Sequence, residues 1–396
     1  MKKILIIAHF CDYGNENSNN RFNYLANLFV EKGYAVELIT SSFSHRDKVQ
    51  RNKEENIKKY RTTLIYEPSY KRNISIKRLF YSHKIFSINM EKYLKKIIDK
   101  PDYIYCAIPS IDSCYAAMQY AKKNGITFII DIQDIWPDAY KLIIKNEKFF
   151  NIITFFMKKK VDLIYKMSDL IISVSDTYLH RAMEACVSQK KSKVVFLGTD
   201  FDKFDQYKSE GKKDDYIKLC YCGTLGFSYD LSIMIEALIV LITEGISNVK
   251  LIILGSGPSE KKLREQSKKI EDYVEFLGKK PYYEMVDILT SCDIALNPIK
   301  SDAAQSIINK HADYCAAGLP ILSTQNCLEY KKLLEEYNCG ITCDSKSIND
   351  IAEAMKYLII NKKEREKMGK NSRKLGEDKF NRKYSYMNII KEIELL

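Results

Sequence analysis

The sequence predicts two α/β domains in tandem, each built on a doubly wound parallel sheet. Its length of 396 residues suits two domains of roughly 150–200 residues each. Short β-branched runs alternate with amphipathic helical patterns from one end to the other. A polar stretch without apolar periodicity, residues 198–216, separates the two series and is expected to be the linker.

The first half opens with a strand, a helix and a second strand. The runs at 2–8 and 35–40 flank a helix expected near 20–32, and Gly33 follows it where a left-handed C-terminal cap belongs. Such a unit implies a parallel sheet whose loops gather at the carboxyl ends of its strands. Further strands are expected at 103–108, 126–131, 170–174 and 193–197.

The second half repeats the alternation. Strands are expected at 217–222, 249–254, 273–277, 293–297 and 320–323. Helices are expected at 230–243, 259–269, 282–291 and 306–317. No short fixed repeat is present, which excludes a solenoid.

The net charge of +12 lies entirely in the first half. Residues 1–200 hold 33 Lys and Arg against 21 Asp and Glu, whereas residues 201–396 hold 30 of each. A field this polarised indicates that the first half meets something anionic: a membrane surface, a nucleic acid or a phosphorylated substrate. The basic segments carry no recognisable nucleic-acid module, which disfavours that partner.

Two segments concentrate the basic residues beside bulky apolar ones. Residues 51–100 carry 14 Lys and Arg against 5 Asp and Glu, and residues 149–160 join an apolar run to three lysines. This combination is typical of an interfacial anchor on anionic lipid. For 149–160 the alternative is an ordinary core helix with a solvated basic end. The aromatic residues of the first segment are Tyr60, Tyr66, Tyr70, Phe80, Tyr81 and Phe86.

Cysteine spacing and hydropathy indicate in which cellular compartment the protein is expected. The eleven cysteines form no CxxC pair and no Cys/His cluster with metal-ligand spacing, so we expect reduced thiols in a cytosolic protein. The opening MKKILIIAHF is too short for a signal peptide and is expected to be a buried strand. No run reaches the ~18 apolar residues of a spanning helix. We therefore expect a chain that is soluble or lies on a membrane without crossing it.

Three glycine-containing loops follow strands of the second half. They contain Gly223 and Gly226, Gly255 and Gly257, and Gly278 followed by Lys279. Glycine lets the backbone approach a ligand, and the amino ends of the following helices favour phosphate. The alternative is that each glycine serves only its turn. None of the loops is a GxGxxG or Walker motif, so a nicotinamide or ATP site has no direct support.

A fourth element is expected to complete a diphosphate site. The pattern from Ser306 to Gly318 predicts a helix opened by Ser306 and ended by Gly318. Its first N–H groups, at Ser306, Ile307 and Ile308, would be free for a diphosphate, and a carboxylate at Asp313 one turn on can hold ribose hydroxyls. Lys310 and Asp313 share one helix face, and the alternative for them is a solvated i,i+3 ion pair.

These segments resemble a known family. GTLGFSYDL, LIILGSGP, VEFLGKKPYYEM and INKHADYCAAGLPILS, in this order, look like the carboxyl-terminal domain of retaining family-4 glycosyltransferases of bacterial surface polysaccharide synthesis. In the first half DIQDIWPD, VSDTYLHRAM and FLGTDFDKF are similar to the same group. The resemblance implies the GT-B fold, in which two Rossmann-like domains face a central cleft. It implies an acceptor domain at 1–199, a nucleotide-sugar domain at 200–379, and a terminal helix at 380–396 that returns to the first domain.

The sequence departs from the family at the phosphate contacts. The family's pair of glutamates, separated by seven residues, falls on Gln305 and Asp313, so only the ribose position keeps a carboxylate. The Arg and Lys that usually follow the first glycine loop fall near Thr224 and Tyr229. Lys310 is the expected replacement cation.

The acceptor side is expected in the first domain. Asp134 follows a strand, precedes Trp136, and is the candidate base or hydroxyl binder; the alternative is a helix N-cap. His9 and Arg21 are assigned to the acceptor side, although His9 is also typical of a core histidine. Gly14 and Asn15 lie in the loop that resembles the donor-phosphate loop.

The resemblance implies a hexosyltransferase-type enzyme (EC 2.4) that needs no metal or cofactor. Departure of a nucleoside diphosphate develops negative charge, which helix amino ends and Lys310 would stabilise. The donor is expected to be like a UDP-N-acetylhexosamine. The expected donor-side residues are Gly14, Asn15, Gly223, Thr224, Gly226, Tyr229, Gly255, Lys279, Gln305, Ser306, Ile307, Ile308, Asn309, Lys310 and Asp313.

The acceptor is expected to be lipid-linked or a polysaccharide, as in capsule, O-antigen or lipopolysaccharide synthesis. The enzyme would be cytoplasmic and peripheral on the inner face of the bacterial plasma membrane. Two alternatives remain. One is a nucleotide-sugar epimerase on the same fold. The other is a non-catalytic scaffold of a polysaccharide assembly complex, which the missing Glu and Arg favour.

Overall fold

A computed structural model describes residues 1–13, 20–52, 58–71, 77–142, 144, 146–208, 215–301, 303 and 306–396. These residues form two compact units, each described by itself below. Unit 1 comprises Met1–Val195 and Tyr386–Leu396, and unit 2 comprises Phe196–Ser385. The first boundary lies at 195/196 rather than at 199/200, and the chain joins unit 1 again at 386 rather than at 380.

Unit 1 is built on a seven-stranded parallel sheet in the order β3-β2-β1-β4-β5-β6-β7. All the strands expected in this half are present, and one more, β3, lies within the segment expected only as a basic surface. β3 was missed because it is an edge strand whose burial is incomplete. The strands are β1 (Lys3–Ile7), β2 (Ala35–Ser41), β3 (Arg61–Ile65), β4 (Tyr103–Ile108), β5 (Thr127–Ile132), β6 (Leu170–Ser173) and β7 (Ser192–Val194).

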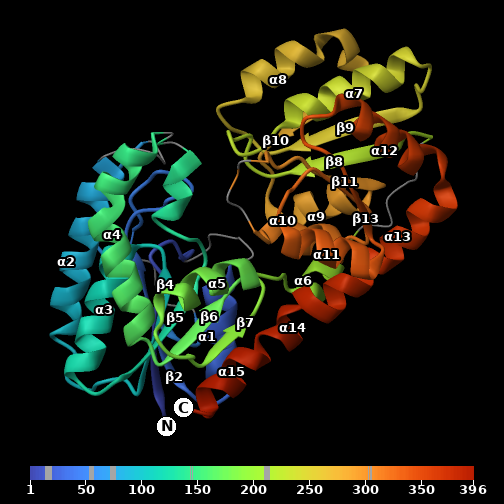
Figure 1. The fold of residues 1–396 in the computed structure, drawn as a ribbon. Helices are drawn as coiled ribbons and strands as arrows, with labels where there is room; N and C mark the ends of the chain where they lie inside the picture. The colour runs from blue at the N-terminus through green and yellow to red at the C-terminus, as the bar shows by residue number, and fades with distance from the viewer. Residues whose placement is uncertain are drawn as a thin grey trace. The chain divides into compact units, whose positions relative to one another are not determined.

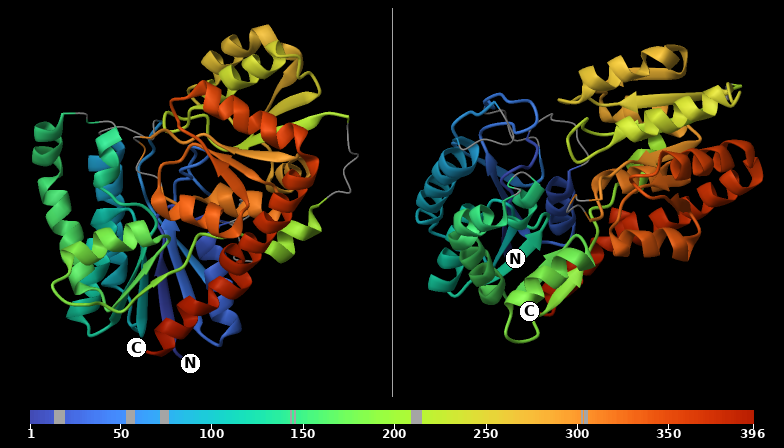
Figure 2. Two further views of the ribbon diagram at one scale, coloured as in Figure 1. Left: turned by 45° about the vertical axis from the view of Figure 1, so that its right-hand side comes forward. Right: turned by 45° about the horizontal axis from the view of Figure 1, so that its top comes forward.

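Helices cover both faces of this sheet (Figures 1 and 2). One face packs against α1 (Arg21–Glu31) and α15 (Met387–Glu394), which share one apolar core with β1, β2 and β4. The other face carries α2 (His83–Leu94), α3 (Ile111–Lys123) and α4 (Glu147–Met167). The remaining helical segments are η1 (Lys77–Ser82), η2 (Asp138–Leu142) and α5 (Asp176–Ala185).

Arg21 is a buried structural residue, which corrects its assignment to the acceptor side. It begins α1, is 3% exposed, and its Nε donates to Asp131 Oδ2 at 2.8 Å while Nη1 donates to the Val195 carbonyl at 3.0 Å. The guanidinium also lies over the Tyr386 ring at 4.7 Å. Arg21 thus joins α1, β5 and the start of the terminal helix, and has almost no surface left for a ligand.

Unit 2 is built on a six-stranded parallel sheet in the order β10-β9-β8-β11-β12-β13. The five expected strands are confirmed, and the short strand β13 was missed. The strands are β8 (Ile217–Cys222), β9 (Val249–Leu254), β10 (Val274–Gly278), β11 (Ile294–Asn297), β12 (Ile321–Ser323) and β13 (Gly340–Thr342).

The expected linker is only partly irregular. It contains α6 (Phe201–Gln206), which Asp200 caps by accepting from Lys203 N, and whose Phe201 and Phe204 are buried in unit 2. Residues 209–214 of the linker lie outside the described residues. The other helical segments of unit 2 are α7 (Leu231–Thr243), α8 (Glu260–Ser267), η3 (Lys268–Tyr273), α9 (Tyr282–Thr290), α10 (Asn309–Ala316), α11 (Leu328–Tyr337), α12 (Ile348–Ile360), α13 (Lys362–Leu375), η4 (Gly376–Phe380) and α14 (Arg382–Ser385).

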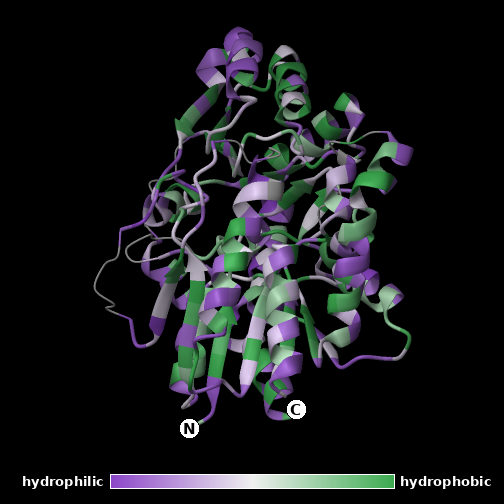
Figure 3. Cartoon of the chain, turned by 90° about the vertical axis from the view of Figure 1, so that its left-hand side faces the viewer, coloured by the Kyte–Doolittle hydropathy of each residue, from purple (hydrophilic) through white to green (hydrophobic). Residues whose placement is uncertain are grey.

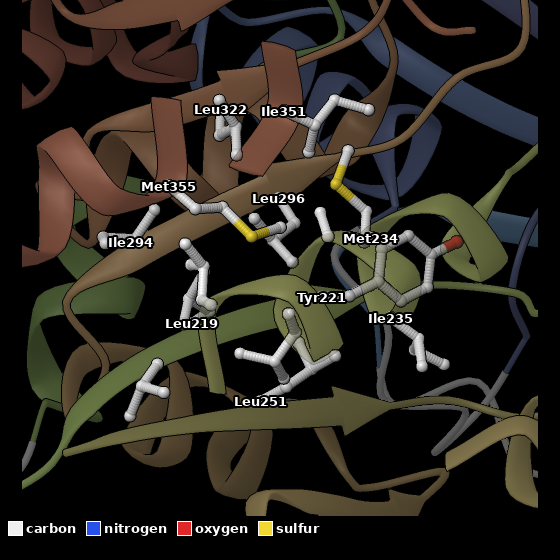
Figure 4. Close-up of a cluster of buried hydrophobic side chains, with 14 of the residues drawn as sticks. Leu219, Tyr221, Met234, Ile235, Leu251, Ile294, Leu296, Leu322, Ile351 and Met355 are labelled. Atoms are coloured by element: carbon white, nitrogen blue, oxygen red, sulfur yellow. The ribbon is translucent and has the colours of Figure 1, made fainter. Parts of the chain in front are cut away.

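Hydrophobic residues hold each sheet between its helices. In Figure 3 green hydrophobic stretches run along the strands, while green and purple alternate along the helices, as expected for parallel sheets covered on both faces. Figure 4 shows one core of unit 2, where side chains of β8, β9, β11 and β12 meet those of α7 and α12. No helix among the described residues has both the length and the apolarity needed to span a bilayer.

We predict that the Arg21–Asp131 pair is a large contributor to the stability of unit 1. Arg21→Met leaves a buried carboxylate without its cation, so the free energy of unfolding should fall by about 3–5 kcal/mol. Urea denaturation followed by circular dichroism measures this. Lys122→Met is the control: it breaks the Lys122–Asp169 pair, whose side chains are a third exposed, and should cost under about 1 kcal/mol. Equal losses in the two variants would contradict the prediction.

Candidate functional site

The order in which the chain adds strands to the unit 2 sheet reverses between β8 and β11. From β8 the chain adds β9 and β10 on one side, then crosses to add β11, β12 and β13 on the other. In open parallel sheets, ligands bind outside the carboxyl ends of the strands at this switch point, because the following loops diverge there. The glycine loops and α10 all follow strands at this edge, as the sequence predicts.

The first two glycine loops pack backbone against backbone. Gly223 and Gly255 adopt φ of +150° and +133°, in the region that favours glycine. A Cβ on Gly255 would lie 1.9 Å from the Gly223 carbonyl oxygen, so no side chain fits there. Gly223 N donates to the Leu254 carbonyl at 2.9 Å, and Gly255 N donates to the Gly278 carbonyl at 2.8 Å. The loops after β8, β9 and β10 are therefore one hydrogen-bonded backbone surface.

The helix after β11 begins later than predicted. α10 starts at Asn309 with Ile308 as its N-cap, and Ser306 does not open it. Instead Ser306 is buried, its carbonyl accepts from Gln325 Nε2 at 2.7 Å, and its hydroxyl lies 3.3 Å from Glu329 Oε2. Gly318 follows the helix at φ +68°, as expected for its C-terminal cap.

A buried tyrosine fixes α10 at the switch point. The hydroxyl of Tyr314, on α10, accepts from Cys222 N at 2.9 Å and donates to the Leu296 carbonyl at 3.2 Å. Cys222 ends β8 and Leu296 lies in β11, so one side chain joins the two strands between which the sheet reverses. This contact holds the second turn of α10 against the carboxyl ends of β8 and β11.

Lys310 lies at this position as a buried ammonium group without a hydrogen-bond partner. Its side chain is 8% exposed, and Nζ makes no hydrogen bond to any residue that the structure describes. Nζ lies 3.9 Å from the ring centroid of Tyr229 and 4.4 Å from that of Tyr221, in cation–π contact. Burial lowers the pKa of Lys310 well below 10.5, with a small opposing effect of Cys222. The solvated ion pair with Asp313, the alternative for these residues, is thus wrong.

Asp313 lies one turn further along α10, partly exposed. Its Oδ1 accepts from the Tyr282 hydroxyl at 3.0 Å, and that hydroxyl lies 2.9 Å from Thr199 Oγ1. Burial of Tyr282, reinforced by the Asp313 charge, raises the pKa of the tyrosine. The hydrogen bond from Tyr282 therefore orients the carboxylate.

The remaining donor-side residues fall into three groups. Thr224, Lys279 and Asn309 are exposed at the same edge, and Ile307 is buried. Gly226 and Ile308 are intermediate in burial. Gly14, Asn15 and Gln305 lie outside the described residues, so their predicted roles stay predictions.

At the carboxyl edge of the unit 1 sheet, His9 is the centre of a buried polar cluster. The residue follows β1 and is 2% exposed. Its Nε2 lies 2.8 Å from Glu67 Oε2 and its Nδ1 lies 2.9 Å from Ser110 Oγ. Burial alone would raise the pKa of Glu67, but His9 and the Ser41 and Ser82 hydroxyls hold it at about 2. His9 is thus a buried histidine, as the core alternative predicts, but its Nε2 contacts the charged carboxylate of Glu67.

Asp134 is not a helix N-cap. Its Oδ1 accepts from Ile135 N at 2.9 Å and its Oδ2 from the Trp136 indole Nε1 at 3.0 Å, and the next helical segment, η2, begins only at Asp138. Burial raises the pKa of Asp134 in spite of these two hydrogen bonds. Trp136 is 9% exposed and its ring stacks near His83. A raised pKa makes this carboxylate a stronger base than a solvent-exposed aspartate.

Several residues that contact these site residues were not predicted from the sequence. Glu67, His83, Tyr221 and Tyr314 had no assigned role, because their partners are far away in sequence. The chain has only five histidines, and in the fold His9, His45 and His83 meet on one aromatic cluster around Phe10. The sequence carries no signal for this cluster, because the three histidines are far apart along the chain.

Comparison with known sequences supports a glycosyltransferase. Residues 202–375, within unit 2, match the family model "Glycosyl transferases group 1". An uncharacterized glycosyltransferase of Methanocaldococcus jannaschii is 23% identical over 257 residues, 63% of this chain and 65% of that protein. WcaL of Escherichia coli, provisionally described as a colanic acid biosynthesis glycosyltransferase, is 26% identical over 166 residues, 41% of this chain and 40% of WcaL. The chain thus spans less than two thirds of the length of both.

Comparison with solved structures shows the two-domain GT-B fold. Sucrose-phosphate synthase from Thermosynechococcus elongatus matches with a TM-score of 0.72 and 15% identity, covering 100% of this chain and 99% of that one. HepE of Anabaena, solved in complex with UDP-glucose, matches with a TM-score of 0.70 and 13% identity, covering both chains fully. The family match and the shared fold together support a GT-B glycosyltransferase.

We predict that the close approach of the glycine loops is required for nucleotide binding. Gly255→Ala forces the loops after β8 and β9 apart, and UDP affinity measured by calorimetry should fall at least about tenfold. Gly245→Ala is the control, because it also places alanine at a positive φ but meets no atom within 4 Å. Unchanged UDP affinity in Gly255→Ala, or an equal loss in Gly245→Ala, would contradict the prediction.

Proposed function

We propose that this chain is a retaining, metal-independent family-4 glycosyltransferase of the hexosyltransferase type. It transfers a sugar from a nucleoside diphosphate, of the UDP-N-acetylhexosamine kind, to a lipid-linked or polysaccharide acceptor. The complex of HepE with UDP-glucose and the description of WcaL support the donor class and the surface-polysaccharide acceptor. Each is a property of that protein, extended here by analogy of fold.

The observation that carries the proposal is Lys310. An ammonium group buried without a hydrogen-bond partner is unfavourable, and an anionic ligand at the switch point would remove that penalty. A diphosphate leaving group gains negative charge as the glycosidic bond breaks, so Lys310 and the amino end of α10 stabilise the transition state more than the ground state. Asp313 is the expected ribose contact, and Tyr282 orients its carboxylate.

Asp134 in unit 1 is proposed as the base or hydroxyl binder for the acceptor. Its raised pKa suits proton uptake from an acceptor hydroxyl, and the Trp136 indole fixes the carboxylate. His9 is proposed as a positioning residue for the acceptor side, since its ring is stacked between Phe10 and Phe86 and is itself buried.

The outer face of α4 is proposed to dock on anionic lipid. Phe149, Ile152 and Phe156 recur at helical spacing and are 56%, 74% and 77% exposed, beside exposed Lys148 and Lys159. The opposite face, with Phe150 and Thr154, is buried, so α4 is a core helix that also presents an apolar, basic surface.

The basic segment 51–100 contributes less to docking than predicted. Tyr60, just before β3, Tyr70, in the loop after it, and Phe86, within α2, are all buried. Tyr66 and Tyr81 remain exposed. The proposed position is the inner face of a bacterial plasma membrane, in the cytoplasm.

Lys310→Met tests the donor site. Removing the cation should lower UDP affinity and reduce turnover by about 10²–10³-fold. Burial lowers the pKa of Lys310 in the free protein, and an anion beside it raises that pKa, so UDP binding should take up protons at pH values between the free and the bound pKa. This uptake should vanish in Lys310→Met. Calorimetry in buffers of different ionisation enthalpy measures the uptake.

Asp134→Asn tests the acceptor side. This variant should keep UDP affinity and lose turnover.

The same assays separate the alternatives. A screen of nucleotide sugars by thermal unfolding should reveal the donor, since a ligand at 100 times its Kd adds about 2.7 kcal/mol. Conversion of the donor without any acceptor would identify an epimerase. Absence of binding by every nucleoside diphosphate would favour a scaffold and contradict the proposal. Full turnover in Asp134→Asn would remove its catalytic role.

We predict that Phe156→Asp weakens binding to vesicles of phosphatidylcholine and phosphatidylglycerol at least about tenfold. Burying such a side chain contributes about 1.5–3 kcal/mol. Sedimentation with vesicles measures the partition. Val187→Asp, at a position that is 96% exposed outside α4, should leave binding unchanged. Equal binding to neutral and anionic vesicles would contradict the electrostatic part of the prediction.

A further inference from the structure

Three potential metal ligands meet inside unit 1, apart from the proposed donor chemistry in unit 2. His9 follows β1, Glu67 follows β3, and His83 begins α2. One ligand atom from each of these residues lies within 4.8 Å of the other two, and all three side chains are buried. Two imidazoles and one carboxylate are a donor set typical of zinc and related transition-metal ions.

Neighbouring hydroxyl groups already orient two of the three ligands. His9 Nδ1 lies 2.9 Å from Ser110 Oγ, which leaves Nε2 directed at Glu67. Glu67 accepts from Ser41 Oγ at 2.6 Å and from Ser82 Oγ at 2.7 Å. Supporting hydrogen bonds of this kind fix the ring orientation and carboxylate position in metal sites and are costly to lose.

The third ligand carries a buried atom that the protein does not satisfy. His83 is 3% exposed, and its Nε2 has no hydrogen-bond partner among the residues that the structure describes. An imidazole nitrogen in this position is available as a metal ligand, and the His83 ring lies edge-on to the His9 ring with 4.9 Å between the ring centroids.

The charges around the cluster limit which ion fits. Glu67 supplies one negative charge, and the Arg78 guanidinium lies 5.2 Å from the centroid of the Phe10 ring, which stacks on His9. A hard ion such as Mg²⁺ depends on several charged or neutral oxygen ligands, which this cluster lacks. A borderline ion that bonds strongly to imidazole nitrogen tolerates the nearby guanidinium better.

We propose that His9, Glu67 and His83 bind a divalent transition-metal ion of the zinc type. The bound ion ties the loops after β1 and β3 to the first turn of α2. Its role is to hold this edge of unit 1, and it takes no part in the departure of the nucleoside diphosphate. His9 also belongs to the proposed acceptor side, but the test of the metal site needs no sugar donor or acceptor, so the two proposals can fail independently.

Zinc binding to the full chain, after removal of metals with EDTA, tests the site. Calorimetry and metal analysis should show one tightly held Zn²⁺ per chain and a zinc-dependent rise in the unfolding temperature. Cobalt(II) in its place should give the visible absorption of a four-coordinate site. His83→Phe, which keeps an aromatic ring in the space, and Glu67→Gln should each weaken zinc binding at least tenfold.

His180→Ala is the matched control, because this exposed histidine on α5 lies outside the cluster, and it should bind zinc like the unchanged chain. Circular dichroism of the metal-free variants reports whether they fold. The chain also has eleven cysteines, so the difference between His83→Phe and His180→Ala decides the outcome. Zinc affinity equal in His83→Phe, Glu67→Gln and the unchanged chain, or no binding by the unchanged chain, would overturn the proposal.

Discussion

Both units depend on one constraint, that all strands in a sheet run parallel. Parallel pairing brings the carboxyl ends of all strands to one edge of each sheet. The order in which strands are added reverses at one place along that edge, between β1 and β4 in unit 1 and between β8 and β11 in unit 2, and the loops on either side diverge there. In unit 2 the constraint is reinforced by a single hydroxyl, that of Tyr314, which bonds to Cys222 and to Leu296 on either side of the split. The positions of α10, Lys310 and Asp313 follow from this contact.

The two edges handle charge differently. In unit 2, Lys310 lies against two aromatic rings, and its Nζ has no hydrogen-bond partner among the residues that the structure describes. In unit 1 the charges near β5 and β1 are compensated internally, Arg21 by Asp131 and Glu67 by the groups around it. Aromatic rings can hold a cation only weakly, which is why a diphosphate would displace these contacts readily, whereas a buried ion pair is costly to open.

Helix α4 has one face buried in unit 1 and an opposite face with exposed apolar side chains. Its buried residues pack on unit 1, while Phe149, Ile152 and Phe156 on the opposite side have nothing to cover them within this unit. An apolar stripe flanked by lysines is favourable at the interface of an anionic bilayer, because the rings enter the headgroup region while the ammonium groups meet lipid phosphate.

The sequence by itself determined the alternating α/β pattern, eleven of the strands and the glycine loops at one sheet edge, because periodicity and turn chemistry are local properties. It did not determine that Arg21 is buried, that α10 begins at Asn309, or that α6 lies within the linker, because these depend on contacts with distant residues such as Asp131, Gln325 and the core of unit 2. The cluster of His9, Glu67 and His83 is the clearest case. Its members share no spacing motif, and only the order of β1, β3 and α2 in the folded sheet brings their side chains together.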